Sequence, residues 1–151
     1  MLKDQIDLLE EFNACGVRYL VVGGHAVSVH GVPRMTKDLD VWIWPAPENG
    51  KAVFQALCRF GAPLAGMTEE DFYCQPDSIF QIGVEPHRVD VMQQITGVNF
   101  DEAWVRRVEG LVDGRVPVFF LGVEDLIHNK LQSGRPRDLG DVDELRKAPR
   151  G

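Results

Sequence analysis

The chain has 151 residues, of which 44% are hydrophobic and 26% are charged, and its formal net charge is −7. This length suits a single domain over residues 1–151 with a sizeable core, and the composition is that of an ordinary soluble globular protein. The acidic balance argues against tight nonspecific binding of nucleic acid. No apolar run is long enough to span a membrane and no signal-peptide pattern opens the sequence, so we expect a cytoplasmic protein.

The first part of the chain alternates helical and strand-like patterns. Apolar residues at helical spacing predict a first helix over 2–12, which Gly16 ends. Residues 17–22 are rich in β-branched and aromatic side chains and predict a buried strand. Gly23-Gly24 then turns the chain, and a short helix follows over residues 25–30.

The middle of the chain carries most of the expected sheet. A second strand begins at Lys37 or Asp38 and ends at Pro45, and Pro47 opens a helix that Gly61 ends. Beyond it we expect a helix of about one turn that starts at Thr68. Strands over 78–84 and 87–92 should form a hairpin, and a short helix capped by Asp101 should follow. Strands over 108–112 and 116–121 then flank the turn Asp113-Gly114.

From about residue 122 the pattern is helical. One helix ends at Gly134 and another begins at Pro136, while residues 146–151 are expected to fray. The order of elements predicts an α/β (α+β) fold, a mixed β-sheet with helices packed on it. Three widely spaced cysteines lack a metal-ligand pattern, and we expect them to be reduced and mostly structural, because free cysteines are usually buried: Cys15, Cys58 and Cys74.

Two aspartates open the second strand. Strand side chains alternate between faces, so Asp38 and Asp40 point the same way, with α-carbons roughly 6.5–7 Å apart. Aspartate disfavours strands, and Asp90 repeats the anomaly in the run Val89-Asp90-Val91. Solvated side chains at strand starts are the simple explanation. The alternative, which we favour, is a two-metal Mg²⁺ site in which Asp90 helps to activate an acceptor hydroxyl.

Other residues around these aspartates have two interpretations each. Gly23 and Gly24 form either a tight turn or a phosphate-binding bend, because missing β-carbons let a ligand approach and helix N-terminal amides favour an anion. Arg34 either steadies phosphates or balances nearby carboxylates. Lys130 either directs its ammonium at phosphate or extends over the surface.

Further side chains near these segments are assigned less specific roles. Trp42 shares the face of the aspartates and is a candidate pocket wall, whereas Trp44 is expected in the core. His25 and His30 are expected to serve helix packing, since neither has a zinc-ligand partner at the usual spacing. Four residues are expected to form an ordinary ion-pair network at a helix start: Arg135, Arg137, Asp138 and Asp141.

In their order along the chain, these residues resemble a known superfamily. Gly23-Gly24, the run Arg34-Met35-Thr36-Lys37-Asp38-Leu39-Asp40 and Arg88-Val89-Asp90 are similar to the nucleotidyltransferase superfamily that includes DNA polymerase β and aminoglycoside nucleotidyltransferases. The segment from Lys130 to Asp141 resembles the tail of small bacterial members, among them the abortive-infection toxin type. The resemblance extends from about residue 17 to residue 145.

The resemblance implies transfer of a nucleoside monophosphate from an NTP, with loss of pyrophosphate, to an acceptor hydroxyl. Asp38, Asp40 and Asp90 would hold two Mg²⁺ ions, and Gly23 with Gly24 would hold the donor phosphates. The superfamily usually has serine where this chain has Gly24. The chain lacks room for a large separate acceptor-binding domain, so we expect an acceptor that is small, held at an oligomer interface or supplied by a partner protein. A small molecule, tRNA and a protein all stay open as the acceptor.

A second hypothesis comes from another functional class. The chain would then be a component of a toxin–antitoxin or defence pair that acts mainly by binding a protein or a nucleotide. A nucleotide or metal sensor without catalysis is a third reading. The three aspartates favour the enzyme, because a pure binding module does not need them.

Overall fold

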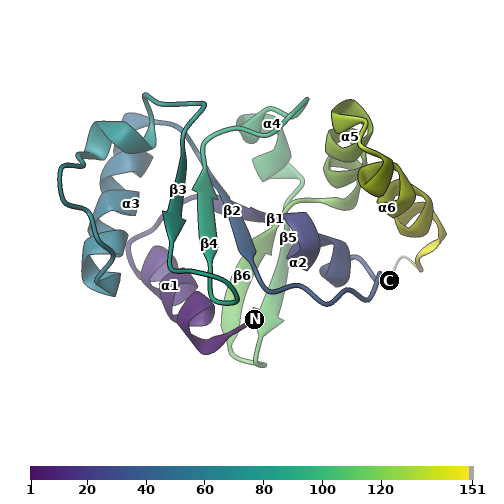
Figure 1. Cartoon of the computed structure of the whole chain (residues 1–151), viewed down its shortest axis with the longest axis horizontal. Coiled ribbons are helices and arrows are strands. Elements are labelled where there is room, and N and C mark those ends of the chain that lie inside the picture. The colour runs from purple at the N-terminus through teal and green to yellow at the C-terminus, as the bar shows by residue number, and fades with distance from the viewer. Residues whose placement is uncertain (150–151) are drawn as a thin grey trace.

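The computed structural model describes residues 1–149, in which helices cover both faces of a six-stranded sheet (Figure 1). The strands are β1 Tyr19–Val22, β2 Leu39–Ile43, β3 Ile79–Ile82, β4 Val89–Met92, β5 Val108–Val112 and β6 Val116–Phe120. The helices are α1 Lys3–Ala14, α2 Gly23–Val29, α3 Pro47–Phe60, the 3-10 helix η1 Glu69–Phe72, α4 Phe100–Val105, α5 Val123–Ser133 and α6 Pro136–Lys147.

The strand order is β3-β4-β2-β1-β6-β5, and the pairing is mixed. β2 runs parallel to β4 and β1 runs parallel to β6, while the other neighbours are antiparallel. The mixed-sheet class and both hairpins expected from the sequence are confirmed. In the turn between β5 and β6, Asp113 and Gly114 both have positive φ, 54° and 68°, as a two-residue hairpin turn requires.

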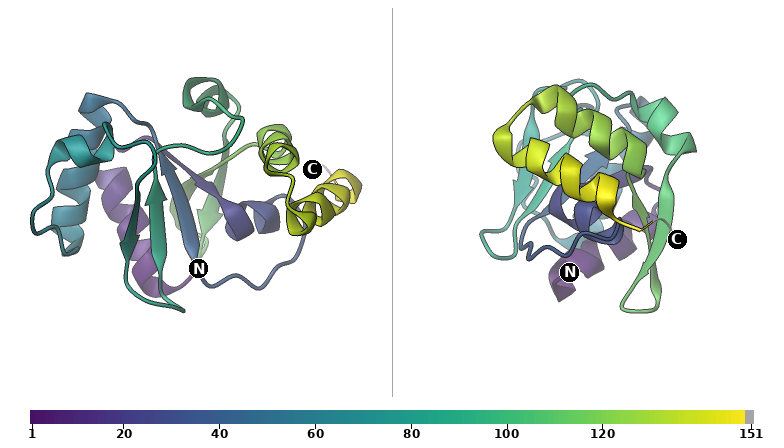
Figure 2. Two further views of the ribbon diagram at one scale, coloured as in Figure 1. Left: turned by 45° about the horizontal axis from the view of Figure 1, so that its top comes forward. Right: turned by 90° about the vertical axis from the view of Figure 1, so that its right-hand side faces the viewer.

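Side chains that alternate along the strands enter two separate apolar clusters. One cluster packs the sheet against α1 and α3, with Phe12 and Leu57 fully buried. The other packs the opposite face against α2, α4, α5 and α6, around Leu20 and Leu126. Figure 2 shows α5 and α6 side by side at one end of the molecule. The second cluster brings the C-terminal helices next to α2, where the diglycine lies.

Several element boundaries differ from those expected. β2 begins at Leu39, so Asp38 lies just before the strand, where its backbone carbonyl accepts a hydrogen bond from the Thr36 hydroxyl at 3.2 Å. α2 already begins at Gly23. α4 is capped by Asn99 and not by Asp101, because the Asn99 side chain accepts the Glu102 amide at 3.2 Å.

The burial on which the expectation of mostly structural cysteines rested is absent for two of the three. Cys15 is half-buried, whereas Cys58 and Cys74 are exposed, and all three are free thiols. At the C-terminus α6 continues to Lys147, so the expected fraying over 146–151 is wrong for its first two residues, and residues 150 and 151 lie outside the described part. Within residues 1–149, every helix is too short or too polar to cross a lipid bilayer.

Candidate active site

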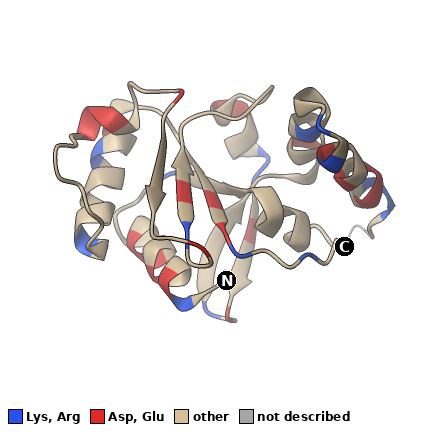
Figure 3. Ribbon diagram, viewed as in Figure 1, with Lys and Arg blue, Asp and Glu red and all other residues tan. Residues whose placement is uncertain are grey.

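Parallel pairing of β2 with β4 places two of the aspartates directly opposite each other. Asp40 is the register partner of Asp90, so both side chains leave the same face of the sheet from α-carbons about 4.8 Å apart. Figure 3 shows the acidic positions side by side on these two strands. Asp38 precedes β2 by one residue and adds a third carboxylate at the same edge of the site.

The diglycine bend lies against Asp40. Gly23 has a φ of +67°, and a β-carbon there would lie 2.3 Å from Asp40 Oδ2. Only glycine therefore allows both this backbone turn and the close approach of the carboxylate. A β-carbon on Gly24 would meet Thr36 Oγ1 at 2.8 Å. The bend is thus packed by side chains of this chain, while the two glycines still contribute to the wall of a pocket.

This pocket, with a volume of about 400 Å³, contains every predicted catalytic, phosphate-binding and metal-binding residue. The three aspartates and the two glycines share it with Arg34 and Lys130, although these residues come from segments far apart in the chain. The remaining lining residues are Arg88, Arg135, Arg137, Asp138 and Asp141. Their chemical roles remain predictions, but their convergence makes a common site possible.

Burial and mutual repulsion change how these carboxylates ionise. Burial, followed by the negative charges of Asp90 and Asp38, raises the pKa of Asp40 to about 6. Burial is also the largest reason why the pKa of Asp90 is raised. A group of carboxylates that resists full ionisation favours a cation in its midst, since the cation removes the repulsion.

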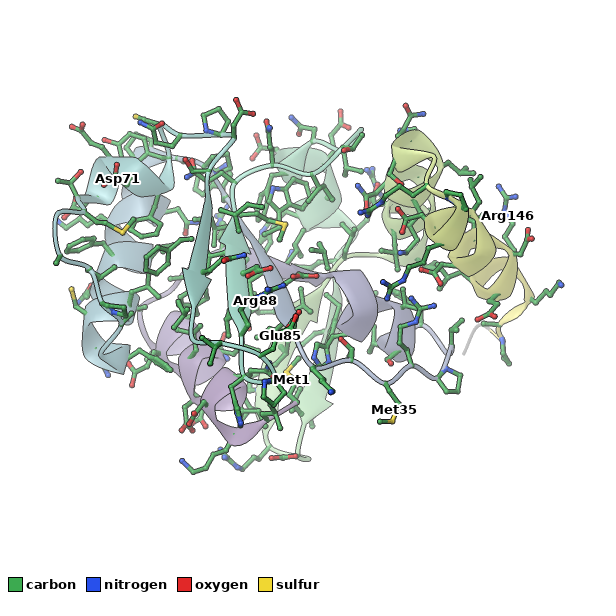
Figure 4. All side chains as sticks on the ribbon, in the orientation of Figure 1. Met1, Met35, Asp71, Glu85, Arg88 and Arg146 are labelled. Carbon is green, nitrogen blue, oxygen red and sulfur yellow. The ribbon has the colours of Figure 1, made fainter. Side chains whose placement is uncertain are left out.

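Arg88, which sequence reasoning left without a role, supplies a cation to this group. Its Nη2 donates to Asp38 Oδ2 at 3.0 Å, and its Nε lies 3.2 Å from Asp90 Oδ1, close enough for an ion pair but not aligned for a hydrogen bond. Figure 4 shows Arg88 in front of β4, with Glu85 nearby. The available signal was strand alternation, which puts Arg88 on the face of Asp90.

The residues of the pocket fit a divalent cation in chemistry, although they are not arranged as a finished metal site. In residues 1–149 no group of three His, Cys, Asp or Glu side chains has metal-binding geometry. However, Asp38 Oδ1 and Asp90 Oδ1 are buried and accept no hydrogen bond from the described residues. Carboxylate oxygens are the ligands that Mg²⁺ prefers, and these two have free lone pairs.

A second group of charges closes the pocket from the side of α5 and α6. The Lys130 ammonium donates to Asp141 Oδ2 at 2.9 Å and to Asp138 Oδ1 at 3.3 Å. Arg135 binds Asp138 at 2.7 Å, as expected of an ion-pair network. Lys130 is only 7% exposed, so the alternative of a lysine extended over the surface is wrong.

Arg34 also joins this network. Both of its terminal nitrogens donate to Asp141, one of them at 3.0 Å, so the carboxylate that Arg34 balances lies on α6, and its contact with phosphate stays a prediction. Burial alone raises the pKa of Asp141, but the hydrogen bonds from Arg34 and Lys130 outweigh it and lower that pKa overall. The 34–38 loop is therefore tied to α6 by charge.

The tryptophans and histidines take mostly structural positions. Trp42 is 2% exposed and meets Phe100 edge-on with ring centroids 4.9 Å apart, so it belongs to the core and does not wall the pocket. Trp44 is half-buried and packs against the second apolar cluster, as expected, with the Arg18 guanidinium 4.9 Å from its ring centroid. His30 Nε2 lies 2.7 Å from the Leu121 carbonyl oxygen and ties α2 to the end of β6.

Comparison with known proteins identifies the family. The model of the family described as "Nucleotidyltransferase of unknown function (DUF6036)" matches residues 1–146, which is nearly the whole chain. The chain belongs to this nucleotidyltransferase family. No curated protein matches the sequence significantly. The resemblance to the nucleotidyltransferase superfamily is thereby confirmed, whereas the abortive-infection toxin type has no support from these matches.

Solved structures share the fold at low sequence identity. A Thermotoga maritima protein provisionally assigned as a nucleotidyltransferase is 14% identical, with a TM-score of 0.60 over 93% of this chain and 86% of its own. The antibiotic-resistance factor ANT(2″)-Ia is 14% identical, with a TM-score of 0.62 over 97% of this chain and 85% of its own. The lincosamide antibiotic adenylyltransferase LnuA, solved with lincomycin, is 20% identical, with a TM-score of 0.59 over 97% of this chain and 96% of its own.

Proposed function

We propose that this nucleotidyltransferase is an Mg²⁺-dependent enzyme that moves a nucleoside monophosphate from an NTP to an acceptor hydroxyl. The observation that carries the proposal is the convergence of Asp38, Asp40 and Asp90 beside the diglycine bend in one pocket. Anionic phosphates and a cluster of carboxylates share such a pocket only if cations lie between them. The buried carboxylate oxygens without hydrogen bonds are available for that purpose.

The chemistry assigns a role to each side chain. The acceptor hydroxyl attacks the α-phosphorus of the NTP. The bond between the α-phosphorus and the oxygen that bridges it to the β-phosphorus breaks, and pyrophosphate leaves. Asp90 takes the proton of the attacking hydroxyl as a general base. Gly23 and Gly24 hold the donor phosphates with backbone amides, and Arg34 and Lys130 add positive charge on the side of α6. Bound Mg²⁺ would neutralise the entering and leaving oxygens.

The family and the fold leave the acceptor open. Two of the structural neighbours are named for resistance to antibiotics or for adenylyl transfer to a lincosamide, which makes a small hydroxyl-bearing molecule the first acceptor to test. We propose that residues 1–151 act as one domain in the cytoplasm, where NTPs and Mg²⁺ are supplied. The exposed free thiols Cys58 and Cys74 are compatible with a reducing compartment.

The experiment is incubation with each labelled NTP and Mg²⁺ in the presence of small-molecule, tRNA or protein pools, and it measures which molecule acquires the label.

We expect Asp90→Asn to lower transfer by at least about 10³-fold, since it removes the proton acceptor and a metal ligand together. Its circular dichroism and melting temperature should stay close to those of the parent. Full activity of Asp90→Asn would refute the assignment. A stable protein partner without any nucleotide binding would favour a toxin–antitoxin component instead.

Arg88 gives a separate prediction on metal affinity. Because its guanidinium binds Asp38 and lies beside Asp90, Mg²⁺ has to displace a positive charge before it reaches those oxygens. We expect Arg88→Gln to tighten Mg²⁺ binding by about 10-fold in calorimetry without nucleotide. Arg115→Gln, which breaks a distant surface pair with Glu10, is the control. Unchanged or weaker Mg²⁺ binding in Arg88→Gln would contradict this role.

A further inference from the structure

The loop between α2 and β2 carries a threonine that packs against the diglycine bend and also donates a hydrogen bond to the backbone of Asp38. Residues 32–38 have no helix or strand of their own, yet they connect the diglycine helix to the strand of Asp40. Thr36 is half-buried in the middle of this loop. Its neighbour Met35 is 95% exposed and points away from the protein (Figure 4). The loop therefore presents one side chain inward and the next one outward.

Thr36 occupies the space that a side chain on Gly24 would need. A β-carbon at Gly24 would lie 2.8 Å from Thr36 Oγ1 and 2.9 Å from Thr36 Cβ. Real β-carbons do not approach other atoms this closely, so residue 24 is glycine because Thr36 fills the position.

The same hydroxyl reaches the first carboxylate segment. Thr36 Oγ1 donates to the backbone carbonyl of Asp38 at 3.2 Å. At the preceding peptide, the buried Gln5 amide donates to the Lys37 carbonyl at 2.7 Å. Asp38 precedes the β2 ladder, so these bonds, together with its contact with Arg88, orient it. One threonine thus contacts a phosphate-binding candidate and a metal-binding candidate.

We propose that Thr36 is a positioning residue that holds the diglycine bend and Asp38 at a fixed separation. This inference rests on the proposed function, in which the bend binds the donor phosphates and Asp38 binds the metal. Thr36 is not a lining residue of the pocket, so it acts through its neighbours and does not contact the NTP. Losing it loosens the distance between phosphate and metal without removing a ligand of either.

The packing half of the proposal is tested by exchange of the two residues. Gly24→Ala forces a β-carbon against Thr36, and we expect the melting temperature to fall by roughly 3–10 °C. Adding Thr36→Gly to Gly24→Ala should restore most of this loss, whereas adding Thr36→Ala should not, because the β-carbon at 2.9 Å remains. Equal melting temperatures for the two double variants would overturn the packing contact.

The functional half is tested by calorimetry with Mg²⁺ and a non-hydrolysable NTP. Thr36→Val keeps the branched shape but removes the donor to Asp38, and we expect about 3- to 10-fold weaker binding. Thr36→Ser keeps the hydroxyl, so it should bind with wild-type affinity. The neighbouring Met35→Ala is the control and should bind as the wild type does. A melting temperature that falls in Thr36→Val with unchanged affinity would mean a merely structural residue and would overturn the proposal.

The outcomes separate this inference from the function on which it rests. If the wild-type protein binds no NTP with Mg²⁺, the proposed function is refuted, and the role of Thr36 in that function is refuted with it. If the wild type binds NTP and Thr36→Val binds it equally well, only the role of Thr36 is refuted.

Discussion

Asp40→Asn is expected to abolish nucleotidyl transfer and, at the same time, to stabilise the protein when no metal is present. The asparagine has the same shape, so it fits against Gly23 as the aspartate does. It removes one negative charge from a group of three, and burial and repulsion already raise the pKa of Asp40 to about 6. A shift of about two units corresponds to an upper limit of about 3 kcal/mol, so we expect a gain of about 1–3 kcal/mol above pH 7.

The sign of the pH dependence follows from the direction of that shift. Asp40 binds its proton more tightly in the folded protein than in the unfolded chain, so its contribution to stability falls as the pH rises from about 4 to about 6. Thermal melts in EDTA at several pH values should show this fall in the wild type and a smaller one in Asp40→Asn. With saturating Mg²⁺ the wild type should be more stable than Asp40→Asn, because only the aspartate is stabilised by binding the metal.

Loss of transfer in Asp40→Asn is expected to reach at least about 10³-fold in the labelled-NTP assay. Lower metal-free stability of Asp40→Asn above pH 7 would contradict the view that this carboxylate is strained by its neighbours. Asp113→Asn is a matched control, because Asp113 lies in the turn between β5 and β6, outside the pocket. Its transfer activity should equal that of the wild type.

Lys130→Met is expected to destabilise the protein more than any other single change proposed. The Lys130 ammonium neutralises Asp138 and Asp141, whose side chains are only 7% and 4% exposed. Removing one partner of a buried ion pair typically costs about 3–5 kcal/mol, and we expect a loss near the lower end of this range because Arg34 still pairs with Asp141 and Arg135 with Asp138. For a chain of this size the melting temperature should fall by on the order of 10 °C.

The same substitution at an exposed ion pair provides the control. Lys3 pairs with Asp7 at 2.9 Å on the surface of α1, where its side chain is 86% exposed. Lys3→Met should leave the melting temperature essentially unchanged, since exposed pairs contribute little. Adding Asp138→Asn and Asp141→Asn to Lys130→Met should recover part of the loss. If Lys130→Met melts like the wild type, Lys130 does not hold α5 and α6 together by charge.

The parts of the fold that follow local rules could be predicted from the sequence. The hairpin at Asp113-Gly114, the helix ends at Gly61 and Gly134 and the helix start at Pro136 each depend on backbone preferences of a few adjacent residues. The convergence of the glycines and aspartates also followed, because strand alternation and chain order constrain where such residues point.

Contacts between distant segments could not be predicted in the same way. Arg34 pairs with Asp141 across 107 positions, and the Gln5 amide donates across 32 positions to Lys37. Nothing in the neighbourhood of either residue specifies its partner. The sequence-based position of Trp42 is wrong for a related reason. Trp42 and Asp40 share one face of β2, but α4 covers the part of that face around Trp42. The pattern of a single strand does not reveal which part of a face a helix covers.

The parallel pairing of β2 with β4 also has a consequence for how the protein acquires its activity. The contact between Asp38 and Arg88 spans 50 positions, and the segment between them forms β2, α3, η1 and β3. Closing such a long loop is among the slower events in folding, so the acidic group assembles only when most of the chain is already ordered. Until then, a partly folded chain experiences little of the repulsion between these carboxylates. Mg²⁺ uptake during refolding would therefore report the last stage of assembly.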